Sequence, residues 1–259
     1  MKIAVCISGQ PRSYKEGFKE LKKWFLSRYD CDVYIHTWKD TTTKFKSSHN
    51  FTKTRYYNFT EEDYQNIIDL YQPKSYNFQK PIPFDNNGII GNLGFTINSI
   101  LSAWFSTQQS IQQALDSKVK YDLIIKYRFD LDFSKTVSPK CEFLKDVTQC
   151  NPEHLHCFSF GTHDEGNYRP TEIDDLFHVG GPRVMEIYSQ LFSNILSYCY
   201  MDKNHINWLV EKTGDPDFLS HESLLKWHLE QNNIYINRVH SLGDKNKYGD
   251  KHFTAGIIR

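Results

Sequence analysis

Several signals that would assign a function directly are missing from this sequence of 259 residues. It has no GxGxxG motif, so it gives no support to a dinucleotide-binding domain. No two of its cysteines form a CxxC pair, and a zinc site is therefore not expected. The six cysteines are Cys6, Cys31, Cys141, Cys150, Cys157 and Cys199.

Charge of one sign is not in excess, because Lys+Arg and Asp+Glu both total 31. A protein that binds nucleic acid normally shows a basic face. The balance therefore predicts no nucleic-acid partner. Aromatic residues, in contrast, are abundant, with 16 Tyr, 18 Phe and 5 Trp, which suits a core and a stacking surface for bases or sugars.

Long apolar runs are missing as well. No segment reaches the ~18 consecutive apolar residues of a membrane span. The N-terminal MKIAVCISG leads directly into a strand pattern, without the longer apolar region of a signal peptide. We expect a soluble, cytoplasmic protein without a transmembrane segment, whose cysteines are free thiols.

The start of the chain predicts two parallel strands joined by a helix. Lys2 to Ser8 is an apolar, β-branched run typical of a buried strand, and Asp32 to Trp38 is a second one. Between them, apolar residues recur at three- and four-residue spacing from Tyr14 to Arg28, which indicates a helix. Gly9 in the intervening turn would let the backbone approach a ligand, and Arg12 could hold a phosphate through two hydrogen bonds.

The rest of the chain continues as alternating strands and helices of one domain, residues 1–259, without a linker. The polar stretch Lys39 to Asn58 is expected to be a long loop, and Thr60 to be the N-cap of a helix, with Asp63 close to a capping box. Further helices are expected at Phe95–Leu115, Arg183–Tyr200 and Ser220–Glu230, and further strands at Ser75–Phe78, His156–Phe160, Leu176–Val179 and Ile234–His240.

The stretch from Tyr121 to Phe133, YDLIIKYRFDLDF, carries the strongest chemical signal. Its apolar run predicts a buried strand that ends in Asp130 and Asp132, and ligands gather beyond such strand ends in open α/β sheets. Two carboxylates there are suitable ligands for a hard divalent cation such as Mg²⁺ or Mn²⁺. From the spacing alone, a salt-bridge cluster that includes Arg128 is an equally good interpretation.

Five segments, in this order, resemble nucleotide-sugar glycosyltransferases of the GT-A fold. The resemblance is greatest to the little-characterised glycosyltransferase-like proteins of surface-polysaccharide clusters and of large viruses and phages. The segments are ISGQPR (Ile7 to Arg12), VYIHTW (Val33 to Trp38), YDLIIKYRFDLDF, DDLFHVGGPRVMEIY (Asp174 to Tyr188) and HESLLKWHL (His221 to Leu229).

The resemblance implies an α/β fold with a mixed, mainly parallel central sheet flanked by helices. Residues 1–135 would form the nucleotide-sugar-binding half and residues 136–259 the acceptor-binding half. A nucleoside-diphosphate sugar would be the donor and a glycan or other hydroxyl compound the acceptor, with Mn²⁺ or Mg²⁺ at Asp130 and Asp132. The residues implied in donor binding are Ser8, Gly9, Gln10, Arg12, Thr37, Trp38, Arg128 and Asp130. His240 and His252 are candidates for a further metal ligand, although a solvated histidine is the ordinary interpretation of each.

An inverting enzyme of this kind needs a general base for the acceptor hydroxyl. Asp175 is the first candidate, followed by Asp174 and then Glu222, although each has an ordinary structural interpretation. An acidic residue in the first turn of a helix, such as Glu222, also favours the helix dipole. His178 and His221 could contact the acceptor or a phosphate, or could be structural.

Two other functions remain open. The run from Asp130 to Ser134 fits the Asp-x-Asp-x-Ser pattern of phosphotransferases and hydrolases that use an aspartyl nucleophile, although that motif normally follows the first strand. A non-catalytic relative that binds a nucleotide or a sugar is the second alternative.

Overall fold

The structure, a computed structural model, describes residues 1–42, 44–49, 53–84, 97–133, 146–158, 173, 175–198, 204–213, 220–239 and 256–257. Its centre is a seven-stranded sheet in the order β10-β8-β9-β6-β1-β2-β5. These strands are β1 (Lys2–Ser8), β2 (Asp30–Trp38), β5 (Ser75–Gln79), β6 (Leu123–Arg128), β8 (His154–Phe158), β9 (His178–Gly180) and β10 (Tyr235–Val239).

The sheet is mixed but mainly parallel, which confirms the expected fold class. β1 pairs in parallel with both β2 and β6, and β2 pairs in parallel with β5. β9 runs antiparallel to both of its neighbours, β6 and β8, while β8 and β10 are parallel. The carboxyl ends of β2, β1 and β6 therefore lie side by side, and we call this row of strand ends the carboxyl edge of the sheet.

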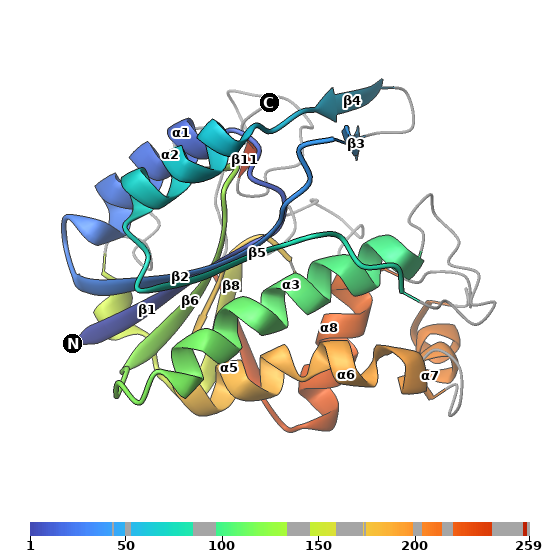
Figure 1. Cartoon of the computed structure of the whole chain (residues 1–259). Coiled ribbons are helices and arrows are strands. Elements are labelled where there is room, and N and C mark those ends of the chain that lie inside the picture. The colour runs from blue at the N-terminus through green and yellow to red at the C-terminus, as the bar shows by residue number, and fades with distance from the viewer. Residues whose placement is uncertain are drawn as a thin grey trace, which may run out of the picture.

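Helices cover both faces of this sheet (Figure 1). One layer holds α1 (Tyr14–Leu21), which continues as a π-helix at Lys22–Leu26, and α2 (Glu61–Tyr71). The other layer holds α3 (Ile97–Asp116), α5 (Pro182–Ser189), α6 (Leu191–Leu196), α7 (Asn204–Thr213) and α8 (His221–Gln231). A single turn of 3-10 helix, Val147–Gln149, precedes β8.

The alternation of side chains along β1 explains why both faces are covered. Ile3, Val5 and Ile7 pack in the hydrophobic cluster on the α1 and α2 side. Ala4 and Cys6 belong to the second cluster, with the apolar side chains of α3, α5 and α8. Because successive residues of a strand point to opposite faces, a run that is apolar throughout must be buried on both.

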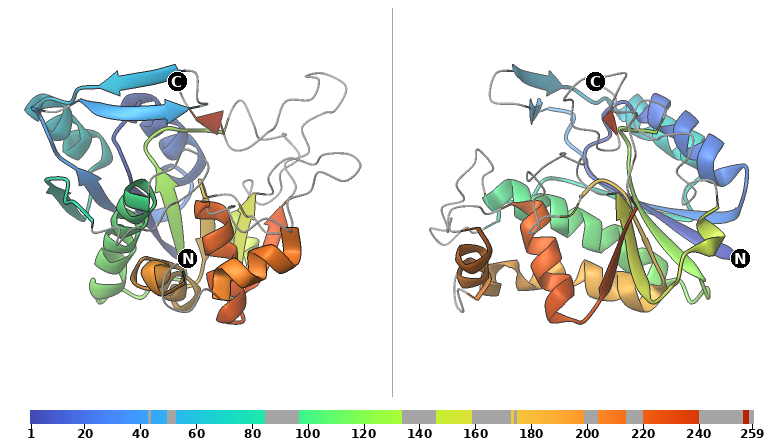
Figure 2. Two further views of the ribbon diagram at one scale, coloured as in Figure 1. Left: turned by 90° about the vertical axis from the view of Figure 1, so that its right-hand side faces the viewer. Right: turned by 180° about the vertical axis from the view of Figure 1, so that it is seen from behind.

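Two small pairs of strands extend the layer that contains α1. β3 (Phe45–His49) pairs with β4 (Lys53–Tyr57), and β7 (Leu131–Asp132) pairs with β11 (Gly256–Ile257). Both pairs lie on the same side of the sheet as α1 (Figure 2). The segment next to the predicted acidic site is therefore paired with one close to the C-terminus.

Three differences from the sequence-based expectations concern local structure. The expectation of a loop at Lys39–Asn58 is wrong where the hairpin of β3 and β4 forms, with Phe45 paired to Tyr57. The stretch is polar as a whole, but it contains residues that favour strands. The expected helix Arg183–Tyr200 is divided into α5 and α6 at Gln190. The helix α7 was not predicted. The capping box at Thr60 and Asp63 is confirmed.

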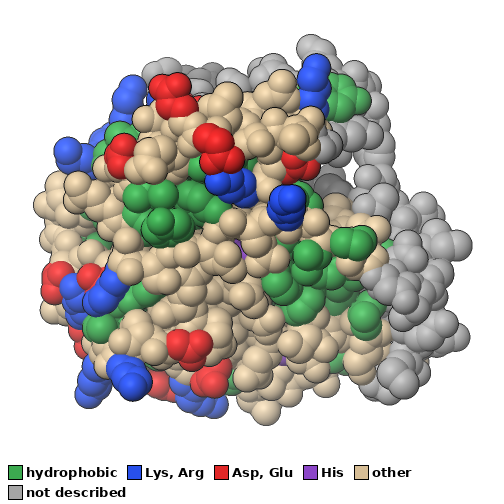
Figure 3. Space-filling model, viewed as in Figure 1, with side chains coloured by type: hydrophobic (Ala, Val, Ile, Leu, Met, Phe, Trp, Pro, Cys, Tyr) green, Lys and Arg blue, Asp and Glu red, His purple; other side chains and the backbone are tan. Residues whose placement is uncertain are grey.

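The described helices include none that is long and apolar enough to cross a membrane. Four of the six cysteines lie in the described part of the chain, and they are free thiols: Cys6, Cys31, Cys150 and Cys157. On the face seen in Figure 3, side chains of both charge signs are interspersed, in agreement with the balanced composition.

Candidate active site

The turn after β1 is held in place by hydroxyl groups from neighbouring elements. Gly9 has a φ of +103°, and a Cβ built there would meet no atom within 4 Å, so open space adjoins its backbone. Thr37 of β2 donates to the carbonyl oxygen of Gly9 at 2.7 Å, and the amide of Gly9 donates to Ser106 of α3 at 3.1 Å. Ser8 contacts Thr107 through their hydroxyl oxygens at 3.1 Å. The turn is therefore rigidly supported from beneath.

A buried histidine extends this support toward the edge of the sheet. His36 lies between Ser106, with 2.8 Å from its Nδ1 to the Ser106 Oγ, and Gln79, with 3.1 Å from its Nε2 to the Gln79 Oε1. Burial lowers the pKa of His36 to about 4, so the ring is neutral near pH 7. Trp38 is buried and stacks on Phe105 with 5.5 Å between the ring centroids.

Of the residues implied in donor binding, Ser8, Thr37 and Trp38 are thus buried and in contact with the protein itself. Gly9 and Gln10 are partly exposed. A donor-binding role for these five residues stays a prediction. The structure assigns Ser8 and Thr37 the local role of fixing the turn.

Asp130 lies beneath two arginines at the carboxyl end of β6. Arg128 donates from Nε to Oδ1 and from Nη2 to Oδ2 of Asp130, both at 3.0 Å. Arg12, from the turn after β1, places its Nη2 3.0 Å from Oδ2 of the same carboxylate. The side chain of Asp130 is 2% exposed, whereas those of Arg12 and Arg128 are 18% and 20% exposed. We call Arg12, Asp130 and Arg128 the arginine clamp.

The charges of the arginine clamp are strongly coupled. Burial by itself would raise the pKa of Asp130, but Arg128 and Arg12 more than offset it and hold the pKa below its ordinary value. Burial lowers the pKa of Arg12, Asp130 raises it, and the nearby Arg128 lowers it again. Arg12 also lies over the ring of Tyr57 in β4, 5.9 Å from the ring centroid. The clamp carries two cations and one anion, a surplus of one positive charge.

A second charged group adjoins the clamp and joins Lys126 to residues from the later half of the chain. Lys126 of β6 is buried, and its ammonium donates to the backbone carbonyls of Asp175 and Leu176. Burial would raise the pKa of the Asp175 carboxyl, but Lys126, Arg128, His221 and His178 together hold it below its ordinary value. Asp175 is therefore an ionised carboxylate at neutral pH.

The two histidines of this group have different surroundings. His221 is the first residue of α8 and is buried, and burial lowers its pKa while Asp175 raises it. His178 contacts the hydroxyl of Tyr188 through Nδ1 at 3.1 Å, within the core. The fold thus brings Arg128, His178 and His221 into the electrostatic neighbourhood of Asp175.

The remaining predicted residues are placed as follows. Glu222 is partly exposed in the first turn of α8, behind the N-cap Ser220, and Asp132 is buried in β7, opposite Gly256 of β11. Asp174, His240 and His252 lie outside the described residues.

Within the ranges given above, no group of three or more His, Cys, Asp or Glu side chains is placed to hold a metal ion. Both oxygens of Asp130 already accept from guanidinium groups, and an added cation there would face two positive charges at close range. Asp130 as it stands does not fit the role of a metal ligand. Mn²⁺ or Mg²⁺ at Asp130 and Asp132 stays a prediction.

Sequence reasoning missed Lys126, Ser106 and His36. A single lysine within the apolar run LIIKY was the available signal for Lys126, because a lysine is almost never buried without partners. Ser106 lies in the middle of a helix whose apolar spacing gives no reason to single it out. Its contacts with Gly9 and His36 depend on how α3 packs across the sheet.

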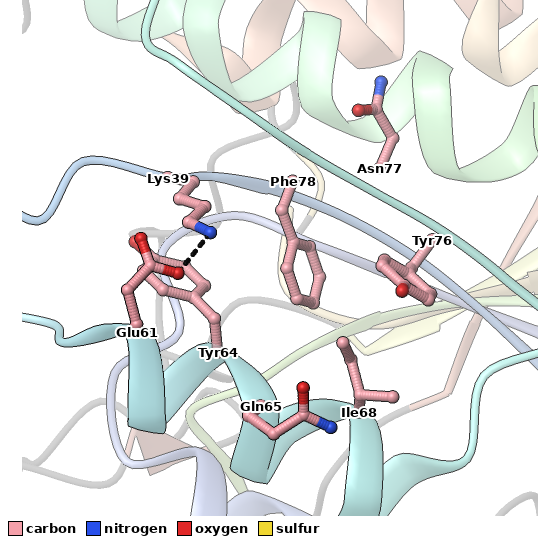
Figure 4. Close-up of a pocket in the computed structure, with 8 residues that line it drawn as sticks. All are labelled: Lys39, Glu61, Tyr64, Gln65, Ile68, Tyr76, Asn77 and Phe78. Carbon is pink, nitrogen blue, oxygen red and sulfur yellow. Dashed lines mark hydrogen bonds and ion pairs between the residues drawn. The ribbon is translucent and has the colours of Figure 1, made fainter.

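A separate hollow of about 400 Å³ lies between α2 and the edge strand β5 (Figure 4). Tyr76 and Phe78 face Gln65 and Ile68 across it, and the ion pair of Lys39 with Glu61 closes one end. None of its lining residues belongs to the arginine clamp. We place the candidate site at the clamp, because charged groups converge there and not in this hollow.

No protein-family model matches the chain, and no curated protein matches it. Solved structures similar to it include a glycosyltransferase involved in the glycosylation of the major capsid of PBCV-1. That structure is 13% identical with a TM-score of 0.41, and the match covers 92% of this chain and 82% of the other. The galactosyltransferase LgtC, in complex with donor and acceptor sugar analogs, is 9% identical with a TM-score of 0.41, covering 91% of this chain and 73% of the other.

A third similar structure is a nucleoside-diphosphate-sugar pyrophosphorylase from Vibrio cholerae RC9. It is 10% identical with a TM-score of 0.39 and covers 92% of this chain and 91% of the other. TM-scores this low carry no argument about function, which has to rest on the residues of the site itself.

Proposed function

We propose that this protein transfers a sugar from a nucleoside-diphosphate sugar to a hydroxyl group of a glycan or another acceptor. The observation that supports this most is the arginine clamp at the carboxyl edge of β1 and β6, beside the open backbone of Gly9. Ligands of open α/β sheets bind at this edge. Guanidinium groups match phosphate oxygens in geometry and charge.

The chemistry of the proposed reaction makes use of this charge. As the bond between the sugar and the diphosphate breaks, negative charge develops on the leaving diphosphate. Arg12 and Arg128, preorganised by Asp130, would stabilise that charge where it forms. In an inverting reaction the acceptor hydroxyl loses its proton to a base on the face of the sugar opposite the diphosphate.

Asp175 is the base we propose. Lys126, Arg128 and His221 keep it ionised, so that it can accept the proton, and Lys126 fixes the backbone on which it is carried. Asp174 is the second candidate from the sequence, and Glu222 is the third. The division into a donor half, 1–135, and an acceptor half, 136–259, stays a prediction, as does the use of Mn²⁺ or Mg²⁺.

The alternatives differ in what they require of Asp130. An aspartyl nucleophile needs an oxygen that can reach phosphorus, and the engagement of both Asp130 oxygens by guanidinium groups disfavours that role. A non-catalytic relative would use the clamp for binding alone. It predicts donor binding without transfer.

The experiment is a panel of UDP-, GDP-, ADP- and dTDP-sugars, each with EDTA and with Mn²⁺. Thermal shift reports binding, and release of the nucleoside diphosphate in the presence of mixed sugar acceptors reports transfer. We expect at least one donor to raise the melting temperature and to be consumed only with an acceptor. A panel in which no donor binds under either condition would refute the proposal, and binding without consumption would favour the non-catalytic alternative.

A further inference from the structure

The arginine clamp has a geometry that differs from the metal site expected from the sequence. The anion is the deepest member, with its side chain 2% exposed, and the two cations lie above it with 18% and 20% exposure. A carboxylate that holds a metal ion against the diphosphate of a sugar donor has to face that donor. Here the guanidinium groups lie closer to the solvent, and the carboxylate faces them.

We propose that Asp130 is a positioning residue that holds Arg12 and Arg128 side by side as a receptor for the donor's diphosphate, and that this receptor works without a divalent metal ion. The inference rests on the proposed function only in taking a nucleoside diphosphate as the ligand. It changes the role of Asp130 from ligand of a cation to anchor of two cations.

Three observations support it together. First, three hydrogen bonds or ion-pair contacts of 3.0 Å join the two guanidiniums to one carboxylate, which fixes both in one orientation. Second, the clamp keeps a surplus positive charge, and two like charges held close together are relieved when an anion binds between them. Third, the described residues include no group of three or more ligating side chains around Asp130.

The surroundings of Arg12 favour the same role. Its guanidinium lies over the ring of Tyr57, and its backbone amide donates to the carbonyl of Gln10 at 2.8 Å, which keeps the turn closed. The turn leaves open space next to Gly9. A phosphate that approaches Gly9 would therefore meet an arginine already in place, with little ordering left to lose on binding.

The test uses inorganic pyrophosphate and inorganic phosphate as probes, because neither needs a known base or sugar. Binding to the full chain is measured by calorimetry in EDTA. We expect pyrophosphate to bind in EDTA more tightly than phosphate, because it brings more negative charge and more oxygens to the two arginines. Arg12→Gln and Arg128→Gln should each weaken pyrophosphate binding on the order of tenfold or more, the equivalent of losing a charge-assisted hydrogen bond.

Asp130→Asn separates positioning from simple charge. Loss of the negative charge alone would change the affinity for both probes in the same direction. Loss of positioning would instead reduce the ratio of the pyrophosphate affinity to the phosphate affinity, and we expect this ratio to fall toward one. Arg12→Lys, which keeps the charge but not the planar fork, should lower it as well and serves if Asp130→Asn does not fold. Arg183→Gln removes an exposed arginine of α5 and is the matched control.

The metal part is tested with the donor identified in the panel above, or with UDP and GDP. We expect equal affinity in EDTA and in Mn²⁺, and no protein-bound Mn²⁺ by electron paramagnetic resonance. If the donor bound more tightly in Mn²⁺ than in EDTA and Asp130→Asn abolished that difference, the metal-free role of the clamp would be overturned. The proposed function, glycosyl transfer, would not be affected by that result. Failure of every donor to bind would instead refute the proposed function.

Discussion

Gly17 of α1 lies directly against the backbone carbonyl of Phe129, the residue before Asp130. A Cβ on Gly17 would lie 1.7 Å from the Phe129 oxygen, so no side chain fits between the helix and this segment. The close approach brings the start of α1, and with it Arg12, within reach of Asp130. A single glycine thus connects the packing of α1 to the geometry of the arginine clamp.

Gly17→Ala should therefore destabilise the protein, although alanine favours helices by about 1 kcal/mol over glycine. The overlap with backbone atoms is expected to cost more than that, with a net loss of about 1–3 kcal/mol in the free energy of unfolding. Urea denaturation measures it. Glu16→Ala, at an exposed position of the same helix, is the control and should be nearly neutral. A Gly17→Ala protein as stable as wild type would contradict this packing.

Much of the fold was predictable because it is encoded in local patterns. Local patterns predict β1, β2 and β6 from their apolar runs and α3 from its apolar spacing. Parallel pairing of β1 with β6 then places Arg12 and Asp130 beyond the carboxyl ends of neighbouring strands. The ion pair of Asp130 with Arg128 was one of the two interpretations that the spacing allowed, whereas the contact with Arg12 was not predictable from spacing. The contact with Arg12 depends on the approach of Gly17 to Phe129, which joins segments far apart in the chain.

Other parts of the site could not be predicted for a related reason. Lys126 resembles a minor interruption of an apolar strand until the segment before β9 supplies two carbonyl acceptors. Ser106 acquires its role only when α3 crosses beneath the turn after β1. Polar groups buried by tertiary packing leave little trace in the sequence around them.

His36 makes stability depend on pH in the acidic range. Its pKa in the folded protein, about 4, lies below the ordinary value of 6.5. As the pH falls, the unfolded state takes up the proton first, so stability is fully present above about 6.5 and is lost between about 6.5 and 4. The loss due to His36 alone is roughly 3–4 kcal/mol at most.

His36→Gln, which keeps hydrogen-bonding capacity near Ser106 and Gln79, should flatten part of this dependence. Urea denaturation from pH 7.5 to pH 5 measures it. His154→Gln removes a partly exposed histidine and is the control. An unchanged slope in His36→Gln would show that His36 is not a source of the effect.

Lys126→Met tests the electrostatic support of Asp175. Removal of the buried ammonium takes away one of the charges that lower the pKa of Asp175, which should therefore rise. Because the base must be ionised to accept a proton, the acidic limb of the pH–rate profile for transfer should move to higher pH.

Loss of the contacts with the carbonyls of Asp175 and Leu176 in Lys126→Met should also cost about 1–3 kcal/mol of stability. Lys212→Met, at an exposed position of α7, is the control, and an unmoved acidic limb would argue against Asp175 as the base.

Asp175→Asn tests the base itself. The amide has nearly the same shape but cannot accept a proton from the acceptor hydroxyl, so transfer should fall by about 10²–10⁴-fold. The contact of Lys126 is with the backbone carbonyl of residue 175, so that support does not depend on the carboxylate. Donor affinity, set by the arginine clamp, should change little, and the affinity and the rate of transfer are therefore measured on the same preparation. Asp116→Asn, at the exposed end of α3, is the control. A variant that transfers sugar at the wild-type rate would exclude Asp175 and make Asp174, and then Glu222, the next residues to replace. A parallel loss of donor binding would place Asp175 in the donor site.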